Sequence, residues 1–192
     1  MCRKIVIADD EPITRMNIAE MLEEAGYEVV GQAADGFDAV EICKRNRPDL
    51  AMLDVKMPLL DGLNAAKIII SEGYAKSVML LTAYSSKEFV EKAKNVGVMN
   101  YLVKPLTEKS ILPAVEIAIH NASMISDYKE ETVKMQEKID ARIVIDRAKG
   151  VLIKNLGYSE EEAYNYIRKL SMDKRSTMKE IAQIILLNEE TR

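Results

Sequence analysis

Residues 1–121 are predicted to form an α/β domain with a doubly wound, five-stranded parallel sheet. Two observations lead to this prediction. Short apolar runs alternate strictly with helical stripes of apolar residues, and the connections are short, as is typical of a parallel sheet covered by helices on both faces. The apolar runs also end at polar residues, and ligands bind at that edge of an open α/β sheet.

Each predicted element has its own apolar pattern and turn residues at its ends. The strands are predicted at residues 4–8, 28–33, 50–53, 78–81 and 100–103. The helices alternate with them: from Pro12 to Gly26, from residue 37 to before Pro48, over 64–71 before Gly73, from a Ser85–Glu88 capping-box pattern onward, and from Thr107 or Ser110 onward.

Chemically active side chains follow four of the five strands. They are Asp9 and Asp10, Asp54, Thr82 and Lys104. Parallel strands bring these groups to one edge, where three carboxylates would repel one another unless a cation lay among them. Mg²⁺ prefers oxygen ligands and keeps several waters, so a few carboxylates suffice. Acids, metal, hydroxyl and lysine together indicate a site for phosphoryl chemistry.

These motifs resemble the receiver domain of bacterial response regulators, and the resemblance covers about the first 120 residues. It implies that Asp54 is the phosphoacceptor, phosphorylated by a sensor histidine kinase. The strict alternation of strands and helices favours a flavodoxin-like strand order of 2-1-3-4-5. The resemblance further implies a cis Lys104–Pro105 bond. The remaining roles implied are Mg²⁺ ligation by Asp9, Asp10, Asp54 and the backbone carbonyl of Lys56, and switching by Thr82, Lys104 and the aromatic Tyr101.

The composition and the lengths of the apolar runs bear on the cellular location of the protein. The chain has 192 residues and a formal net charge of −4. No apolar run approaches the ~18 residues that span a bilayer, and the amino terminus enters a charged strand edge, so we expect a cytoplasmic protein without membrane contact. Cys2 and Cys43 lack metal or CxxC spacing and are expected to be reduced thiols.

The predicted fifth helix is followed by a long stretch without a helix-ending signal. Residues 114–149 contain neither Gly nor Pro, and a helix of that length would span about 50 Å. Residues 122–138 are therefore predicted to be a linker helix that pairs with a second copy as a coiled coil, giving a dimer on phosphorylation. A flexible charged linker is the alternative. The seam runs through Ile111, Val115, Ala118, Ala122 and Ile125, slips in phase, and continues through Tyr128, Thr132, Met135 and Ile139.

Residues 139–192 are predicted to form a three-helix bundle. Gly157 ends its first helix, while Ser159 with Glu162 and Thr177 with Glu180 form capping boxes for the other two. The bundle is almost balanced in charge, so its basic residues either hold phosphates or are ordinary solubilising charge. Tyr164 lies beside the apolar stripe and could stack on an unpaired base.

The segment from Ile145 to Leu152, followed by Ala163-Tyr164, Ile167-Arg168 and Ile181-Ala182, is similar to the ANTAR module of transcription antiterminators. That resemblance implies binding to RNA hairpins in leader transcripts, which prevents a terminator from forming. The residues expected to contact RNA are Arg147, Lys149, Gly150, Tyr164, Arg168 and Lys179.

Two other output functions are open. The last two helices could form a helix-turn-helix that reads DNA through Thr177, Lys179 and Glu180, although the segment 171–177 reads as longer than the usual tight turn. The bundle could also be a protein-interaction module. An enzyme is not expected, because His120 lies alone on a helix without a nucleophile partner and a receiver catalyses only its own phosphorylation and dephosphorylation.

Overall fold

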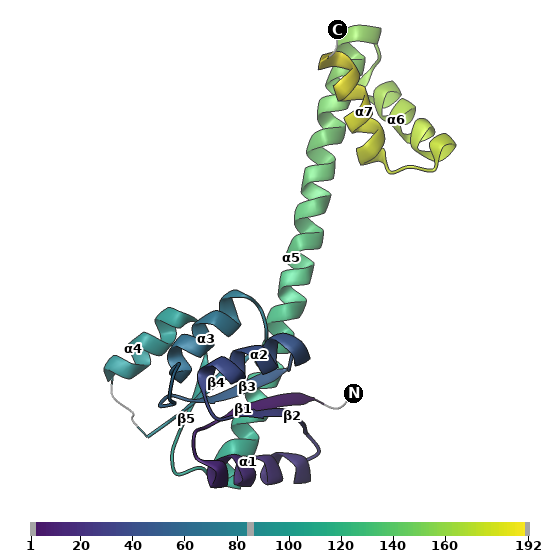
Figure 1. Ribbon diagram of the computed structural model, residues 1–192. Helices are drawn as coiled ribbons and strands as arrows, with labels where there is room; N and C mark the ends of the chain where they lie inside the picture. The colour runs from purple at the N-terminus through teal and green to yellow at the C-terminus, as the bar shows by residue number, and fades with distance from the viewer. Residues whose placement is uncertain (1–2, 84–86, 191–192) are drawn as a thin grey trace. The chain divides into compact units, whose positions relative to one another are not determined.

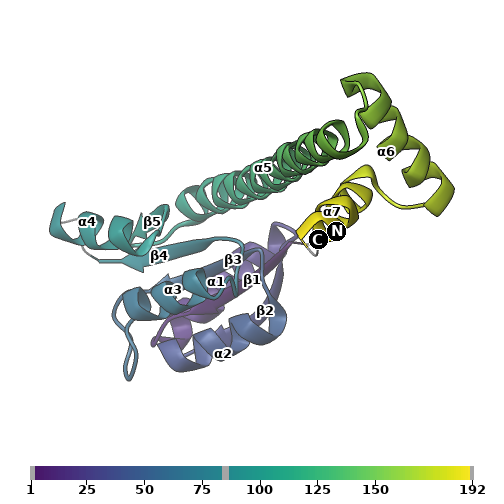
Figure 2. The same cartoon turned by 90° about the horizontal axis from the view of Figure 1, so that it is seen from above.

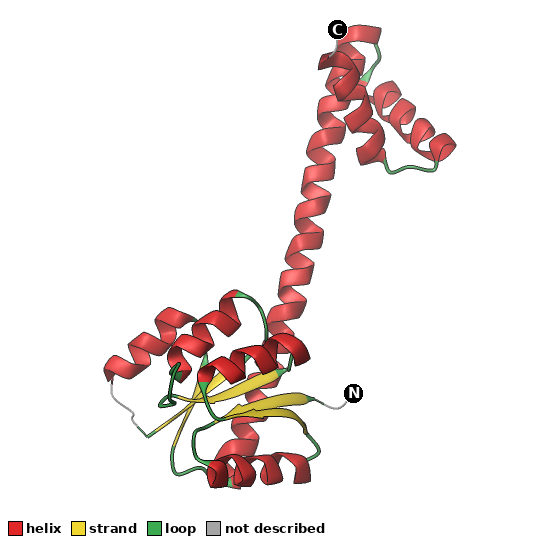
Figure 3. Ribbon diagram, in the orientation of Figure 1, coloured by secondary structure: helices red, strands yellow, loops and turns green. Residues whose placement is uncertain are grey.

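The computed structural model describes residues 3–83 and 87–190. Its first part is a single parallel sheet of five strands flanked by helices (Figure 3). The strand order is β2-β1-β3-β4-β5, which confirms the predicted flavodoxin-like order 2-1-3-4-5. The strands are β1 (Lys4–Ala8), β2 (Glu28–Ala33), β3 (Leu50–Asp54), β4 (Val78–Thr82) and β5 (Asn100–Val103).

Alternation along the strands divides the core into two layers. Even-numbered residues of β1 such as Val6 pack with α2 (Gly36–Asn46), α3 (Gly62–Ser71) and α4 (Lys87–Val96). Odd-numbered residues such as Ile5 pack instead with α1 (Pro12–Glu24) and the first turns of α5 (Glu108–Leu156). Successive strand side chains point to opposite faces, so the near-continuous apolar strands fill both layers. Figure 1 shows helices on both sides of the sheet.

The fifth helix is long, as predicted. Helix α5 runs as one element from Glu108 to Leu156, and both views draw it without a break (Figures 1 and 2). Its start follows Thr107, whose carbonyl accepts the amide of Ile111 at 2.9 Å, so Pro113 lies inside the helix and not in its first turn. Ser85, the first residue of the Ser85–Glu88 capping pattern, lies outside the described residues, so that pattern stays a prediction. The Lys104–Pro105 bond is cis, as the receiver resemblance implied.

The chain divides into two compact units, Met1–Ser126 and Asp127–Arg192. In the second, α6 (Glu160–Lys174) and α7 (Met178–Glu190) pack against the last turns of α5. The shared core consists of Ala148, Leu152, Ala163, Ile167, Ile181 and Ala182. This arrangement confirms the short helical carboxy-terminal region that the apolar stripes predicted.

Turn chemistry marks the helix ends of the second unit. Gly157 follows α5 with φ +71°, a left-handed conformation that glycine adopts without steric cost. The Ser159–Glu162 capping box is present at the start of α6, and Thr177 and Glu180 make the same reciprocal pair before α7. One expectation was wrong. The segment 171–177 is not a long turn, because α6 continues to Lys174 and only three residues join it to α7.

No helix within residues 3–83 and 87–190 combines the length and apolarity needed to span a membrane.

The sheet core sets the stability of the first unit. Leu80 is fully buried in β4, so Leu80→Ala should lower the free energy of unfolding by about 2–5 kcal/mol, measured by urea denaturation. Leu59→Ala is the matched control, since Leu59 is 83% exposed and should change stability by less than about 0.5 kcal/mol. Equal losses in both variants would contradict the layered core.

Candidate functional site

Strand register brings the predicted site residues to one edge of the sheet. Ala8 of β1 pairs with Leu53 of β3, so Asp9 and Asp54 follow at neighbouring strand ends. On the other side of β3, Thr82 of β4 pairs with Val103 of β5. The amide of Lys104 donates to the Thr82 carbonyl at 2.8 Å. Residues far apart in sequence therefore meet because the strands are parallel and in register.

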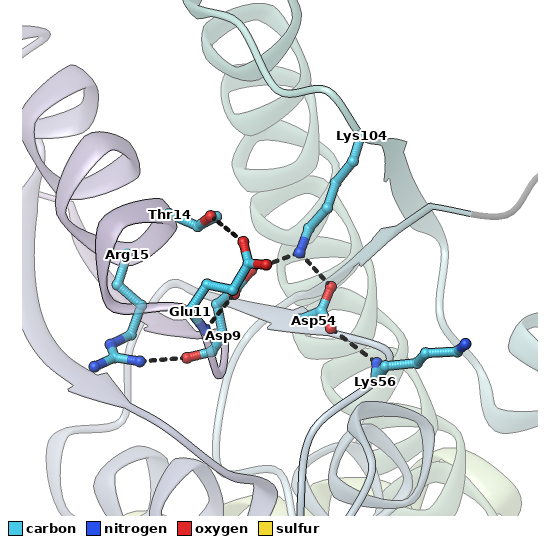
Figure 4. Close-up of polar contacts among 7 residues, drawn as sticks. All are labelled: Asp9, Glu11, Thr14, Arg15, Asp54, Lys56 and Lys104. Carbon is cyan, nitrogen blue, oxygen red and sulfur yellow. Dashed lines mark hydrogen bonds and ion pairs between the residues drawn. The ribbon is translucent and has the colours of Figure 1, made fainter.

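The centre of the site is an ammonium group between two carboxylates (Figure 4). Lys104 Nζ lies 2.8 Å from Asp9 Oδ2 and 2.7 Å from Asp54 Oδ1. Both aspartates are buried, whereas the Lys104 side chain is partly exposed. A buried carboxylate is costly unless paired, so one lysine stabilises two acids that would otherwise repel each other.

The loop after β1 holds Asp9 in place through contacts that the sequence analysis did not anticipate. The Glu11 amide donates to Asp9 Oδ1 at 3.0 Å, and Arg15 Nη1 donates to the Asp9 carbonyl (Figure 4). Glu11 Oε2 in turn accepts the Thr14 hydroxyl at 2.8 Å. Arg15 is the fourth residue of a helix that starts at Pro12, a position from which a long side chain reaches back to the strand end. That spacing was the available signal.

Gly62 packs closely against the backbone of Asp54. A Cβ built at this glycine would lie 1.9 Å from the Asp54 carbonyl oxygen, so no other residue fits without moving that backbone. The Gly62 amide also donates to the Val55 carbonyl at 3.1 Å, and the Lys56 amide donates to Asp54 Oδ2 at 2.9 Å. Gly62, the first residue of α3, thus fixes the backbone that carries Asp54.

Burial and charge shift the titration of this site in opposite ways. Burial raises the pKa of Asp54 above its ordinary value, although the hydrogen bond from Lys104 opposes the shift. For Lys104, burial would lower the pKa, but hydrogen bonds to Asp54 and Asp9 outweigh it and the net pKa is raised. The lysine is therefore firmly charged, and the carboxylate beside it is under electrostatic strain.

The donor set suits a hard divalent cation. Asp9 and Asp54 offer buried carboxylate oxygens with a single ammonium between them, which leaves excess negative charge for an ion such as Mg²⁺. Asp10 is exposed, and across the described residues no three acidic, His or Cys side chains converge into a ready-made metal site. The acidic pair and the Lys56 carbonyl therefore stay predicted ligands, with Asp9 and Asp54 already close together.

The two predicted switch residues differ in their surroundings. Thr82 is buried at the end of β4, adjacent to the Asp54 strand, whereas the Tyr101 side chain on β5 is 43% exposed. Outside the site, burial raises the pKa of the Cys43 thiol to about 12, so this thiol is protonated at neutral pH. Cys2 lies outside the described residues.

The second unit separates the predicted RNA contacts into two kinds. Arg147, Gly150 and Arg168 are exposed, as is Tyr164 at 43%, while Lys179 is half-buried. Lys149 differs, because its ammonium lies 2.8 Å from Asp146 Oδ1 and 2.9 Å from Glu160 Oε1, and its side chain is only 14% exposed. Hydrogen bonds that the Lys149 ammonium donates to Asp146 and Glu160 raise the pKa of Lys149. The i, i+3 spacing to Asp146 was the sequence signal for this pairing.

Tyr158 and Tyr166 pack against each other. Their rings meet edge to face with centroids 5.7 Å apart, a favourable aromatic geometry. Tyr164 has no part in that pair.

The five-stranded parallel sheet with acidic residues at its carboxyl edge is the arrangement of a receiver domain. Comparison with known proteins identifies the family. The response regulator receiver domain matches residues 5–116, and the ANTAR domain matches residues 133–186. The chain therefore belongs to the response regulators and joins a receiver domain to an ANTAR output domain. These two domains point to a regulator.

Relatives agree with this assignment. The transcriptional regulatory protein PdtaR of Mycobacterium tuberculosis is 42% identical over 184 residues, covering 96% of this chain and 89% of PdtaR. The chemotaxis protein CheY of Treponema pallidum is 35% identical over 58% of this chain and 79% of CheY. This second likeness concerns the receiver alone.

Solved structures match the receiver domain. The signal receiver domain of the putative response regulator NarL from Mycobacterium tuberculosis has a TM-score of 0.59 at 31% identity, covering 62% of this chain and 97% of that one. The receiver domain of the sensor histidine kinase PA1611 from Pseudomonas aeruginosa has a TM-score of 0.57 at 29% identity, covering 62% and 99%. The latter structure has a magnesium ion coordinated in its active site cleft.

The raised pKa of Asp54 can be tested through the pH dependence of stability in metal-free buffer. A raised pKa means that the folded state binds the Asp54 proton more tightly than the unfolded chain does. The contribution of Asp54 to the free energy of unfolding should therefore fall as pH rises from 3.8 through the folded-state pKa, and this contribution stays lost at neutral pH. Asp54→Asn removes that charge and should raise the free energy of unfolding at pH 7 by on the order of 1 kcal/mol.

Urea denaturation between pH 4 and pH 8 in EDTA measures this effect. Asp10→Asn is the matched control, since it removes an exposed carboxylate from the adjacent position and should change little. A less stable Asp54→Asn protein at pH 7 would show that the Lys104 ion pair outweighs the cost of burial.

Proposed function

We propose that this chain is a phosphorylation-activated antiterminator. A sensor histidine kinase phosphorylates Asp54, the receiver domain then favours a dimer, and the ANTAR domain binds RNA hairpins in a leader transcript so that a terminator does not form. The proposal places the protein in the cytoplasm, where leader transcripts are made. The observation that supports it best is the Lys104 ammonium shared by Asp9 and Asp54 at the carboxyl edge of the sheet.

The chemistry follows from that arrangement. One carboxylate oxygen of Asp54 forms a bond to phosphorus while the phosphorus–nitrogen bond of the kinase phosphohistidine breaks, and the imidazole leaves with the electron pair. Lys104 would then pair with the phosphoryl group in place of the Asp54 carboxylate it contacts now. Asp9, Asp10, Asp54 and the Lys56 carbonyl would hold Mg²⁺, which neutralises charge on the transferred phosphoryl group.

Switching would follow from the new charge. A phosphoryl group adds negative charge and strong hydrogen-bond acceptors at one edge of the sheet. Thr82, at the end of the next strand, would donate its hydroxyl to it, and the half-exposed Tyr101 would turn inward. These movements would change the surface formed by α4, β5 and α5. That surface would have two conformations, and the new charge at Asp54 would shift the equilibrium between them.

The surface of α5 supports the dimer. Every residue from 126 to 140 is exposed, including the apolar side chains of Tyr128, Met135 and Ile139. Together with Thr132 they lie on one stripe at alternating spacings of four and three, the pattern of a two-stranded coiled coil. Two copies of the output domain would then bind paired hairpins with avidity.

RNA is favoured over DNA by the match to the ANTAR domain at residues 133–186. The helix-turn-helix alternative keeps one supporting observation, since three residues join α6 to α7 and a turn of three or four is usual for that motif. A competition between hairpin RNA and duplex DNA for the phosphorylated protein separates the two readings.

The switch is tested by hairpin binding with and without a phosphoryl donor. Wild-type protein treated with acetyl phosphate and Mg²⁺ should bind a hairpin selected from a random-loop RNA library at least about tenfold more tightly than untreated protein, a typical coupling free energy. Asp54→Ala should bind equally in both conditions, because it has no acceptor. Equal affinity of the wild type in both conditions would reject the switch, and preferential binding of duplex DNA would reject the RNA target.

The dimer is tested by light scattering of the phosphorylated protein. Ile139→Asp places a charge in the apolar stripe and should keep the treated protein monomeric. Val133→Asp is the matched control, because Val133 is also exposed on α5 but lies off the stripe, and it should leave dimerisation intact. Dimers formed by the Ile139→Asp protein would show that another surface is used.

A further inference from the structure

The Lys149 side chain forms ion pairs that hold the output domain together. Its ammonium joins Asp146, one turn earlier on α5, to Glu160 in the first turn of α6, at 2.8 and 2.9 Å. With only 14% of its side chain exposed, it has little surface for another ligand. The contact also offsets two carboxylates that would otherwise repel an anion at this surface. Lys149 therefore behaves as a positioning residue between α5 and α6.

Gly150, the next residue, has no structural reason to be glycine. It lies in the interior of α5, where glycine is less favourable than alanine. Its φ is not left-handed, and a Cβ built there would meet no heavy atom within 4 Å. Neither the backbone nor the packing of the described chain requires the missing side chain. The gap lies on the outer surface of the helix.

Two exposed cations flank this gap. Arg147 precedes Gly150 by three residues and Lys154 follows it by four, so both share its face of the helix, one turn away on either side. Neither has its charge engaged by a salt bridge within residues 3–83 and 87–190. Lys154 was not among the residues predicted to contact RNA. Gly150 therefore lies between two exposed basic side chains on this face of α5.

We propose that an RNA phosphate backbone crosses α5 at Gly150, between Arg147 and Lys154, and that Lys149 positions this surface without touching the RNA. The assignment rests on the proposed RNA-binding function and names the contact chemistry of that function. Without a Cβ, a phosphodiester can approach the helix backbone closely, while Arg147 and Lys154 supply charge-assisted hydrogen bonds to its oxygens. Charge complementarity selects the occupant, because the face offers cations and no exposed carboxylate of its own except Asp146, which Lys149 offsets.

The test uses the full chain treated with acetyl phosphate and Mg²⁺, and a hairpin selected by that protein from a random-loop RNA library. Gly150→Ala should melt at a higher temperature than the wild type and yet bind the hairpin about tenfold more weakly, a loss comparable to one hydrogen bond to a charged group. Asn165→Ala, an exposed site on α6, controls for a substitution that changes only helix propensity.

Salt dependence separates contact from positioning. Arg147→Gln and Lys154→Gln should each reduce the slope of log affinity against log salt concentration by about 0.7–0.9, the loss of one phosphate contact. The double variant Lys149→Gln with Glu160→Gln keeps the net charge and should keep the slope, while its melting temperature falls by about 2–4 °C.

The outcomes distinguish this assignment from the function on which it rests. If the wild type binds no hairpin, the proposed function fails and the assignment fails with it. If the wild type binds but Gly150→Ala binds equally well, or if the Lys149 and Glu160 double variant loses about one unit of salt slope, the assignment is overturned and the RNA-binding function stands.

Discussion

The receiver domain depends on one ammonium group shared by two buried carboxylates. Lys104 stands at the end of the last strand, and its contacts with Asp9 and Asp54 tie β5 to β1 and β3 across the edge of the sheet. The arrangement is electrostatically strained, because burial raises the pKa of Asp54 even with the lysine in contact. Strain of this kind is characteristic of functional sites, where a group is held ready for chemistry at some cost in stability.

The backbone around the site is built to hold that strain. Gly62 packs directly on the Asp54 carbonyl, where a Cβ would not fit, and Arg15 and Glu11 fix the backbone and carboxylate of Asp9. Close packing on both faces of the sheet leaves the strand ends little freedom to relax. A change in charge at Asp54 is therefore expected to be relieved where the structure is less constrained, toward β5 and its half-exposed Tyr101.

In the output domain, ion pairs and hydrogen bonds stabilise the fold and do not strain it. Its small core is closed by two capping boxes and by the Lys149 ion pairs between α5 and α6, all of which are local devices. They bring order to a bundle whose apolar core is too small to give much stability alone. Fixing the helices in this way leaves Arg147, Gly150 and Lys154 on an outer surface that the fold does not need.

The sequence by itself determined the order of elements, the strand ends that carry Asp9, Asp54, Thr82 and Lys104, and the continuous α5, because apolar periodicity, turn residues and caps are local signals. Only the tertiary structure decided which polar groups meet. Gly62 lies in close contact with the Asp54 backbone, and Asp10 is exposed beside two buried acids. Lys149 was expected to contact RNA and is paired with Asp146 and Glu160. Local patterns specify where a side chain lies along its element, whereas its partners come from other elements brought near by packing, and no local pattern encodes those distances.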